Sequence, residues 1–164
     1  INVFSEDIKY FPYENLYLSL NHNSPKHIFL DIYRTIEKLY PIIFCMKIKK
    51  EMGIVDMELF DIHIKLKSEL NWNHKEAEAI KEIFEYAEDL SIQNISFIND
   101  FKESLDPQYK TMRIDNWIYQ IRNTSVHLSF DDEKKIDIDK CLNKDVLIKN
   151  LIPIISNLYK TIFI

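Results

Sequence analysis

The chain has 164 residues, 46% of them hydrophobic and 29% charged, which fits a single globular domain that buries roughly 70% of its unfolded surface in one core. The formal charge of −5 argues against a domain that binds nucleic acid through bulk electrostatics, although it leaves room for a local basic site. Gly53 is the only glycine. Phosphate loops and dinucleotide fingerprints need several glycines, so P-loop and Rossmann chemistry are excluded.

Scarce glycine and long stretches of 3.6-residue periodicity predict an all-α bundle of about five to six helices. Residues 1–23 are predicted to form an irregular N-terminal segment, in which "NLYLSL" could be a short strand or a draped segment. The helical domain is predicted to span residues 24–164. Its first helix has Ser24 as N-cap and Pro25 at the first helical position, and it runs to about residue 43 with a kink at Pro41.

Further helices are predicted at residues 57–70, 75–90 and 113–128, with a shorter one in "NISFINDFKESL" that ends before Pro107. The last helix, residues 145–163, is apolar on most sides, so it is predicted to be buried centrally or to pack against another chain. The segment "DDEKKIDIDK" between these two is predicted to be a solvated connector.

Processing and compartment signals indicate a cytoplasmic protein. No signal peptide is evident, and no apolar run approaches the ~20 residues that a bilayer needs, so no membrane span is predicted. Cys45 and Cys141 lack paired spacing and are predicted to be buried free thiols in a reducing compartment. The chain starts with Ile1 rather than Met, so we expect an excerpt of a longer protein, with a regulatory or sensor domain outside it.

The helix at residues 113–128 carries two distinct faces. Its apolar residues lie within about 100° of one another: Ile114, Trp117, Ile118, Ile121 and Leu128. Neutral polar residues lie within about 60° on nearly the opposite side: Asn116, Gln120, Asn123 and His127. Solvated faces usually carry Lys and Glu, whereas amides make directional hydrogen bonds. This amide face is therefore predicted to meet a partner, the alternative being a purely structural interface.

One end of that helix carries a recognisable motif. In the stretch 122–127 an arginine is followed directly by a polar residue, and four residues in all separate the arginine from a histidine. This pattern resembles the signature of HEPN domains, where it lies near the end of a late helix of an all-α bundle. The segment Tyr33-Arg34…Glu37 in "FLDIYRTIEKLY" also resembles the early helix of several HEPN branches. The resemblance covers about residues 24–164.

The resemblance implies metal-independent RNA cleavage by a dimer, without a cofactor, in prokaryotic toxins or anti-phage defence. Arg122 would hold the scissile phosphate, and His127 would transfer protons, because imidazole has both forms available near neutral pH. Asn123 would orient the imidazole or bind the phosphate. Tyr33 would support the site, and Glu37 would pair with Arg122 or Arg34, unless Arg34 and Glu37 form only a surface pair.

Dimerisation would complete such a site. Arg122 and His127 differ by about 140° around an ideal helix, so they meet at one phosphate only if the helix bends or the partner chain supplies one of them. The homodimer is therefore expected to form through this helix, with Asn116 and Gln120 in the interface. Two alternatives remain. One is a non-catalytic HEPN-like module that binds RNA, a nucleotide or a partner protein, and the other is a plain helical interaction module. No coherent set of metal ligands is predicted.

Overall fold

The computed structural model describes residues 8–126 and 143–163, and every regular element within these ranges is a helix. The helices up to residue 126 are α1 (Tyr13–Asn21), α2 (Pro25–Glu37), α3 (Tyr40–Glu51), α4 (Leu59–Leu70), α5 (Glu76–Leu90), α6 (Ile92–Glu103) and α7 (Ile114–Val126). Further along, α9 (Lys144–Val146) continues through a π-helical segment, η3 (Leu147–Leu151), into α10 (Ile152–Phe163). The predicted all-α bundle is confirmed.

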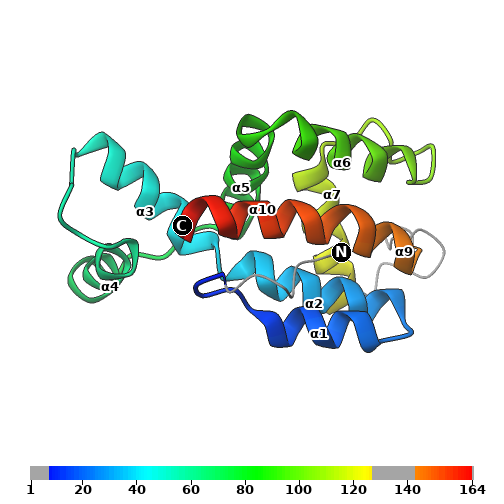
Figure 1. The fold of residues 1–164 in the computed structure, drawn as a ribbon, viewed down its shortest axis with the longest axis horizontal. Helices are drawn as coiled ribbons and strands as arrows, with labels where there is room; N and C mark the ends of the chain where they lie inside the picture. The colour runs from blue at the N-terminus through cyan, green and yellow to red at the C-terminus, as the bar shows by residue number, and fades with distance from the viewer. Residues whose placement is uncertain (1–7, 127–142, 164) are drawn as a thin grey trace.

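Helix α10 runs through the middle of the molecule, with α1 and α2 along one side and α5 and α6 along the other (Figure 1). Its inward side chains are buried: Ile152, Ile154, Ile155, Leu158 and Tyr159. The Tyr159 hydroxyl donates a hydrogen bond of 2.9 Å to the backbone oxygen of Thr35 in α2, so even its polar group is satisfied inside the core. The prediction of a centrally buried last helix is confirmed.

The same helical stretch bears on the membrane prediction. Among the described residues, Lys144–Phe163 is the one helix long and apolar enough to cross a membrane, judged by length and composition. Of its most apolar window, 44% is buried inside the molecule. Packing of α10 in the core therefore accounts for part of its apolar composition.

Helices α3 and α4 form a hairpin that projects from one end of the bundle (Figure 1). In α4 only Ile62 is fully buried, whereas α3 also packs against α5. The loop at residues 71–75 returns the chain from α4 to the start of α5. The hairpin thus brings this loop next to α3 and the first turn of α5.

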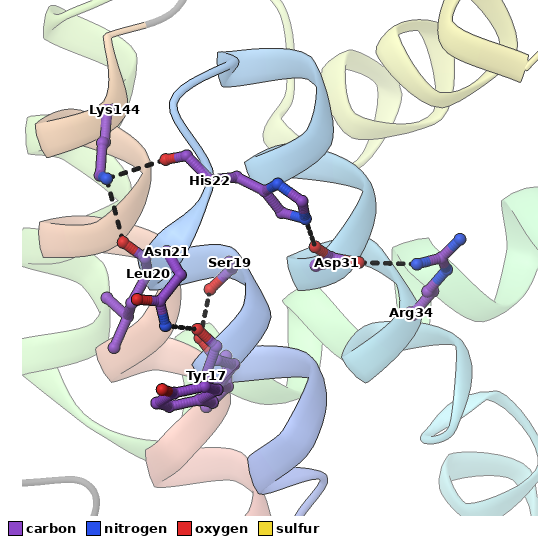
Figure 2. Close-up of polar contacts among 9 residues, drawn as sticks. Tyr17, Ser19, Leu20, Asn21, His22, Asp31, Arg34 and Lys144 are labelled. Carbon is purple, nitrogen blue, oxygen red and sulfur yellow. Dashed lines mark hydrogen bonds and ion pairs between the residues drawn. The ribbon is translucent and has the colours of Figure 1, made fainter.

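Helix α1 corrects the prediction of an irregular N-terminal segment. The helix packs on α2 and buries Leu16 and Ser19. At its C-terminal end the Lys144 ammonium donates to the backbone oxygens of Leu20 and His22, at 3.0 and 2.8 Å (Figure 2). The Asn, Ser and Tyr residues of this segment have modest helix propensity. Tertiary packing and this distant cation therefore stabilise a helix that local sequence does not favour.

The predicted single kinked helix is in fact two helices. Helix α2 starts at Pro25 as predicted, after Ser24 as N-cap, although the Ser24 hydroxyl makes no capping hydrogen bond. It ends at Glu37, and α3 begins at Tyr40. Pro41 explains the break, because its ring clashes with the carbonyl four residues earlier, which is that of Glu37, and it has no N–H to donate.

Two other predictions concern the cysteines and the charged connector. Cys45 is a buried free cysteine, as predicted, and burial raises the pKa of its thiol to about 11. Cys141, Leu128 and the charged connector lie outside the described residues. The other helices predicted from periodicity are observed with shifts of a few residues at their ends.

Candidate functional site

Helix α7 presents the two faces that its sequence predicts. Trp117, Ile118 and Ile121 are completely buried, and Trp117 packs edge-on against Phe29 and Phe101. Asn116 and Gln120 are exposed, and Asn123 is half-buried. His127 lies outside the described residues. The amide face is thus open to solvent in the single chain along Asn116 and Gln120.

Arg122 turns away from that face towards the bundle. Its side chain is only 21% exposed, and its Nε atom lies 2.9 Å from Oε1 of Glu76 at the start of α5. Nη1 donates to the Asn123 side-chain oxygen at 3.1 Å. The guanidinium carbon lies 6.0 Å from the centre of the Tyr33 ring, within the range of a cation–π contact. Three side chains therefore fix the orientation of the guanidinium.

A chain of hydroxyl groups continues from Glu76 into the core. The Tyr33 hydroxyl donates a short hydrogen bond to Oε1 of Glu76, the same oxygen that Arg122 contacts. The Tyr40 hydroxyl donates to the Tyr33 hydroxyl at 2.5 Å. Burial raises the pKa of both tyrosines, so both hydroxyls keep their protons and act as donors. Tyr33 thus holds the carboxylate that pairs with Arg122.

Glu37 lies within electrostatic reach of two guanidinium groups. Burial raises the pKa of its carboxyl, the Arg122 and Arg34 charges oppose that shift, and the Glu76 charge adds to it. Arg122 forms an ion pair with Glu76, and the predicted interaction of Glu37 with Arg122 or Arg34 is seen as an electrostatic effect of both arginines on the Glu37 pKa. Glu37 therefore contributes to the charge balance around Arg122.

Arg34 is held one turn earlier along α2. Its Nη1 atom donates to Oδ1 of Asp31 at 2.6 Å, and His22 Nε2 lies 3.1 Å from the other carboxylate oxygen (Figure 2). Asp31 is 3% exposed, and its buried carboxylate forms an ion pair with Arg34 through one oxygen while the His22 ring lies beside the other. The exposed Arg34 side chain is therefore oriented by Asp31, and its effect on Glu37 is electrostatic.

Sequence reasoning missed Glu76 and Tyr40. An acidic residue in the first turn of a helix is ordinary, because it complements the helix dipole, so Glu76 gave no signal. Tyr40 follows Tyr33 by seven residues, a spacing that would place both on one face of the single helix predicted from the sequence, and this was the one available hint. Within the described residues, no three His, Cys, Asp or Glu side chains gather closely enough to hold a metal ion.

The arrangement suits recognition of an anion. A guanidinium held by Glu76 and Asn123 loses little further freedom when it binds a phosphate, and its planar fork matches phosphate oxygens. Partial burial strengthens such contacts relative to bulk water. No protein-family model matches the chain, and neither curated proteins nor solved structures give a match.

Proposed function

We propose that this chain is a metal-independent endoribonuclease of HEPN type that acts as a homodimer in the cytoplasm, in prokaryotic anti-phage defence or as a toxin. The observation that carries the proposal is the fixed guanidinium of Arg122, the first residue of the HEPN-like motif, beside Glu76, Asn123 and Tyr33. An enzyme that stabilises charge on a phosphate needs a donor whose orientation is set before the reaction.

The chemistry requires one base and one acid. A neutral imidazole of His127 removes the proton of the ribose 2′-hydroxyl, whose oxygen then attacks the adjacent phosphorus. The bond from phosphorus to the 5′-oxygen breaks, and a protonated His127 gives that oxygen its proton. The products are a 2′,3′-cyclic phosphate and a 5′-hydroxyl. Arg122 stabilises the charge that develops on the phosphate oxygens.

The homodimer supplies the second imidazole. The exposed amides of Asn116 and Gln120 are suited to an interface, and a two-fold axis near them would bring two copies of α7 together. Asn123 links this face to Arg122, because its side-chain oxygen accepts from the guanidinium.

A specific observation favours a second candidate, a non-catalytic HEPN-like module that binds RNA, a nucleotide or a partner protein. Glu76 pairs with Arg122 and offsets its charge, as in a structural ion pair. In that case Arg122 would hold α7 against α5, and its loss would lower stability without abolishing a reaction.

Cleavage of single-stranded RNA in the presence of EDTA separates the two candidates. We expect the protein to cleave RNA and leave 2′,3′-cyclic phosphate ends, mapped by end-specific labelling. Arg122→Ala and His127→Ala should each reduce the rate by about 100-fold or more. Arg113→Ala is the matched control, because the Arg113 side chain precedes α7, is 54% exposed and pairs with Glu85 and Asp115 rather than with the proposed site.

The outcomes are distinct. Retained cleavage in Arg122→Ala or His127→Ala would contradict the proposed site, provided that circular dichroism shows folded variants. RNA binding without cleavage by the unmodified protein would favour the binding module. Loss of cleavage in EDTA alone would indicate a metal-dependent nuclease instead.

A further inference from the structure

The loop at residues 71–75 carries two aromatic rings, and one of them, His74, contacts the Tyr40 end of the hydroxyl chain that leads to Glu76. Asn71 adopts a left-handed conformation (φ 47°) that ends α4, and the backbone N–H of Trp72 donates to Leu66 at 3.2 Å. The Trp72 ring lies 5.6 Å from the Phe44 ring, edge to face, and 5.9 Å from the His74 ring. The loop thus displays an indole and an imidazole next to α3.

These rings are incompletely covered by the rest of the molecule. Trp72 and His74 are both half-buried, in contrast to Trp117, which has no exposed surface. Burial and the neighbouring His63 lower the pKa of His74, against an opposing effect of Glu76, which favours the uncharged form of its imidazole. An uncharged imidazole is an aromatic ring on which a base can stack.

A series of contacts through Tyr40, Tyr33 and Glu76 connects His74 to Arg122. The His74 ring packs edge-on against the Tyr40 ring, with centres 5.3 Å apart. The Tyr40 hydroxyl donates to Tyr33, Tyr33 donates to Glu76, and Glu76 pairs with Arg122. Glu76 also follows His74 by two residues, so the loop leads directly into the carboxylate that holds the guanidinium.

Proteins commonly bind single-stranded RNA by combining a cationic side chain with exposed aromatic rings. Its backbone is bound by cations, and its unpaired bases stack on aromatic rings with little dependence on sequence. A double-stranded RNA keeps its bases stacked internally and cannot use such rings. The negative net charge of the chain also favours a site with few phosphate contacts and a larger share of stacking.

We propose that Trp72 and His74 form a stacking platform for a base of single-stranded RNA whose neighbouring phosphate is held by Arg122. The inference rests on the proposed function and deepens it by giving the substrate class. The platform itself makes no use of His127, so it can be tested in the absence of cleavage.

The chain carries its own probe for this test. Of its two tryptophans, Trp117 is buried, so a change of tryptophan emission on ligand binding reports on Trp72. The ligand is a 2′-O-methyl oligonucleotide of about six nucleotides, which has no 2′-hydroxyl to act as nucleophile. We expect saturable quenching of the emission, absent in Trp72→Phe, and no quenching with the same sequence as a duplex.

Affinity is measured by fluorescence anisotropy of a labelled oligonucleotide. Trp72→Ala should weaken binding by about 5- to 150-fold, and Trp72→Phe, which keeps a ring, by much less. His74→Ala should also weaken it, whereas Tyr17→Ala, which removes a 62% exposed ring on α1, should not. Thermal melting of each variant identifies any loss of fold, and Trp72→Phe keeps the test decisive if Trp72→Ala unfolds.

Failure of the platform and failure of the proposed function give different results. Unchanged affinity in folded Trp72→Ala, or no binding by the unmodified protein, overturns the platform, and the cleavage assay then decides the nuclease independently. Binding that depends on Trp72, without any cleavage of unmodified RNA, supports the platform and overturns the nuclease.

Discussion

At the scale of single residues, the Arg122–Glu76 ion pair is neither fully buried nor fully exposed to solvent. The exposed fractions of the two side chains are 21% and 27%, so water screens the pair less than it screens a surface ion pair. Partial desolvation is offset by additional partners, namely Asn123 for the guanidinium and Tyr33 for the carboxylate. The pair is therefore held in one geometry, which a binding site for phosphate requires.

Removing the hydroxyl of Tyr33 and removing that of Tyr40 leave different hydrogen-bonding groups without a partner. Tyr33→Phe removes the acceptor of the buried Tyr40 hydroxyl and a donor to Glu76, so we expect a cost of about 1–3 kcal/mol in the free energy of unfolding. Tyr40→Phe removes one donor and leaves the contact between Tyr33 and Glu76 in place, so its cost should be about 0.5–1.5 kcal/mol.

Urea denaturation followed by circular dichroism measures both values, with Tyr17→Phe as a control at an exposed tyrosine. The double variant Tyr33→Phe/Tyr40→Phe should cost less than the sum of the single changes, because the hydroxyl orphaned in one variant is absent from the double variant. Additive costs, or a larger cost for Tyr40→Phe, would contradict the hydroxyl chain described for this core.

Sequence could identify the polar residues on α7 but could not assign all their partners. Periodicity distinguishes the buried Trp117 from the exposed Gln120, because helical geometry fixes their relative directions. Arg122 and Glu76 lie in different helices and are 46 positions apart in the sequence, and no local pattern encodes such a contact. Asn123 shows the same limit, since its oxygen holds Arg122, a role that its spacing alone did not indicate.

At the scale of elements, a helix boundary can be predicted from sequence when residues within the same turn determine it. Pro25 and Pro41 determine backbone geometry within one turn, so the start of α2 was predictable, and the end of α2 follows from the ring of Pro41. Helix α1 depends on distant groups, and sequence therefore failed to predict it. Lys144, more than 120 positions away, supplies donors to its last carbonyls.

Lys144→Met should therefore destabilise the end of α1. The substitution keeps the apolar stem of the side chain and removes two charge-assisted hydrogen bonds, so we expect the free energy of unfolding to fall by about 1.5–3 kcal/mol. Lys149→Met is the matched control at an exposed position, where a change within about 0.5 kcal/mol is expected. Thermal or urea denaturation gives the two values.

Hydrogen exchange locates the effect. Amide protons in the last turn of α1 should exchange faster in Lys144→Met than in the unmodified protein, while those of α5 should change only with global stability. Equal effects of Lys144→Met and Lys149→Met would mean that α1 is stabilised by its packing on α2 alone.

At the scale of the whole molecule, α10 and α7 differ in how much of their surface is left exposed. Helix α10 contacts both halves of the bundle and has little exposed surface on which a site could form (Figure 1). Helix α7 buries one face and leaves Asn116 and Gln120 exposed. Arg122 faces the bundle rather than these amides, so Asn123 is the residue through which a partner at the amide face would influence the guanidinium.

The expected dimer can be tested by one charge placed at the amide face. In a two-fold interface centred on this face, Gln120→Glu puts like charges on both partners near the axis, and such juxtaposition costs several kcal/mol. We expect the dissociation constant of the dimer, measured by sedimentation equilibrium, to rise at least about tenfold, with RNA cleavage falling in parallel. Gln108→Glu makes the same chemical change at an exposed turn and should leave both quantities unchanged. A dimer of unaltered affinity in Gln120→Glu would exclude this face, because a two-fold interface cannot avoid meeting its own added charge.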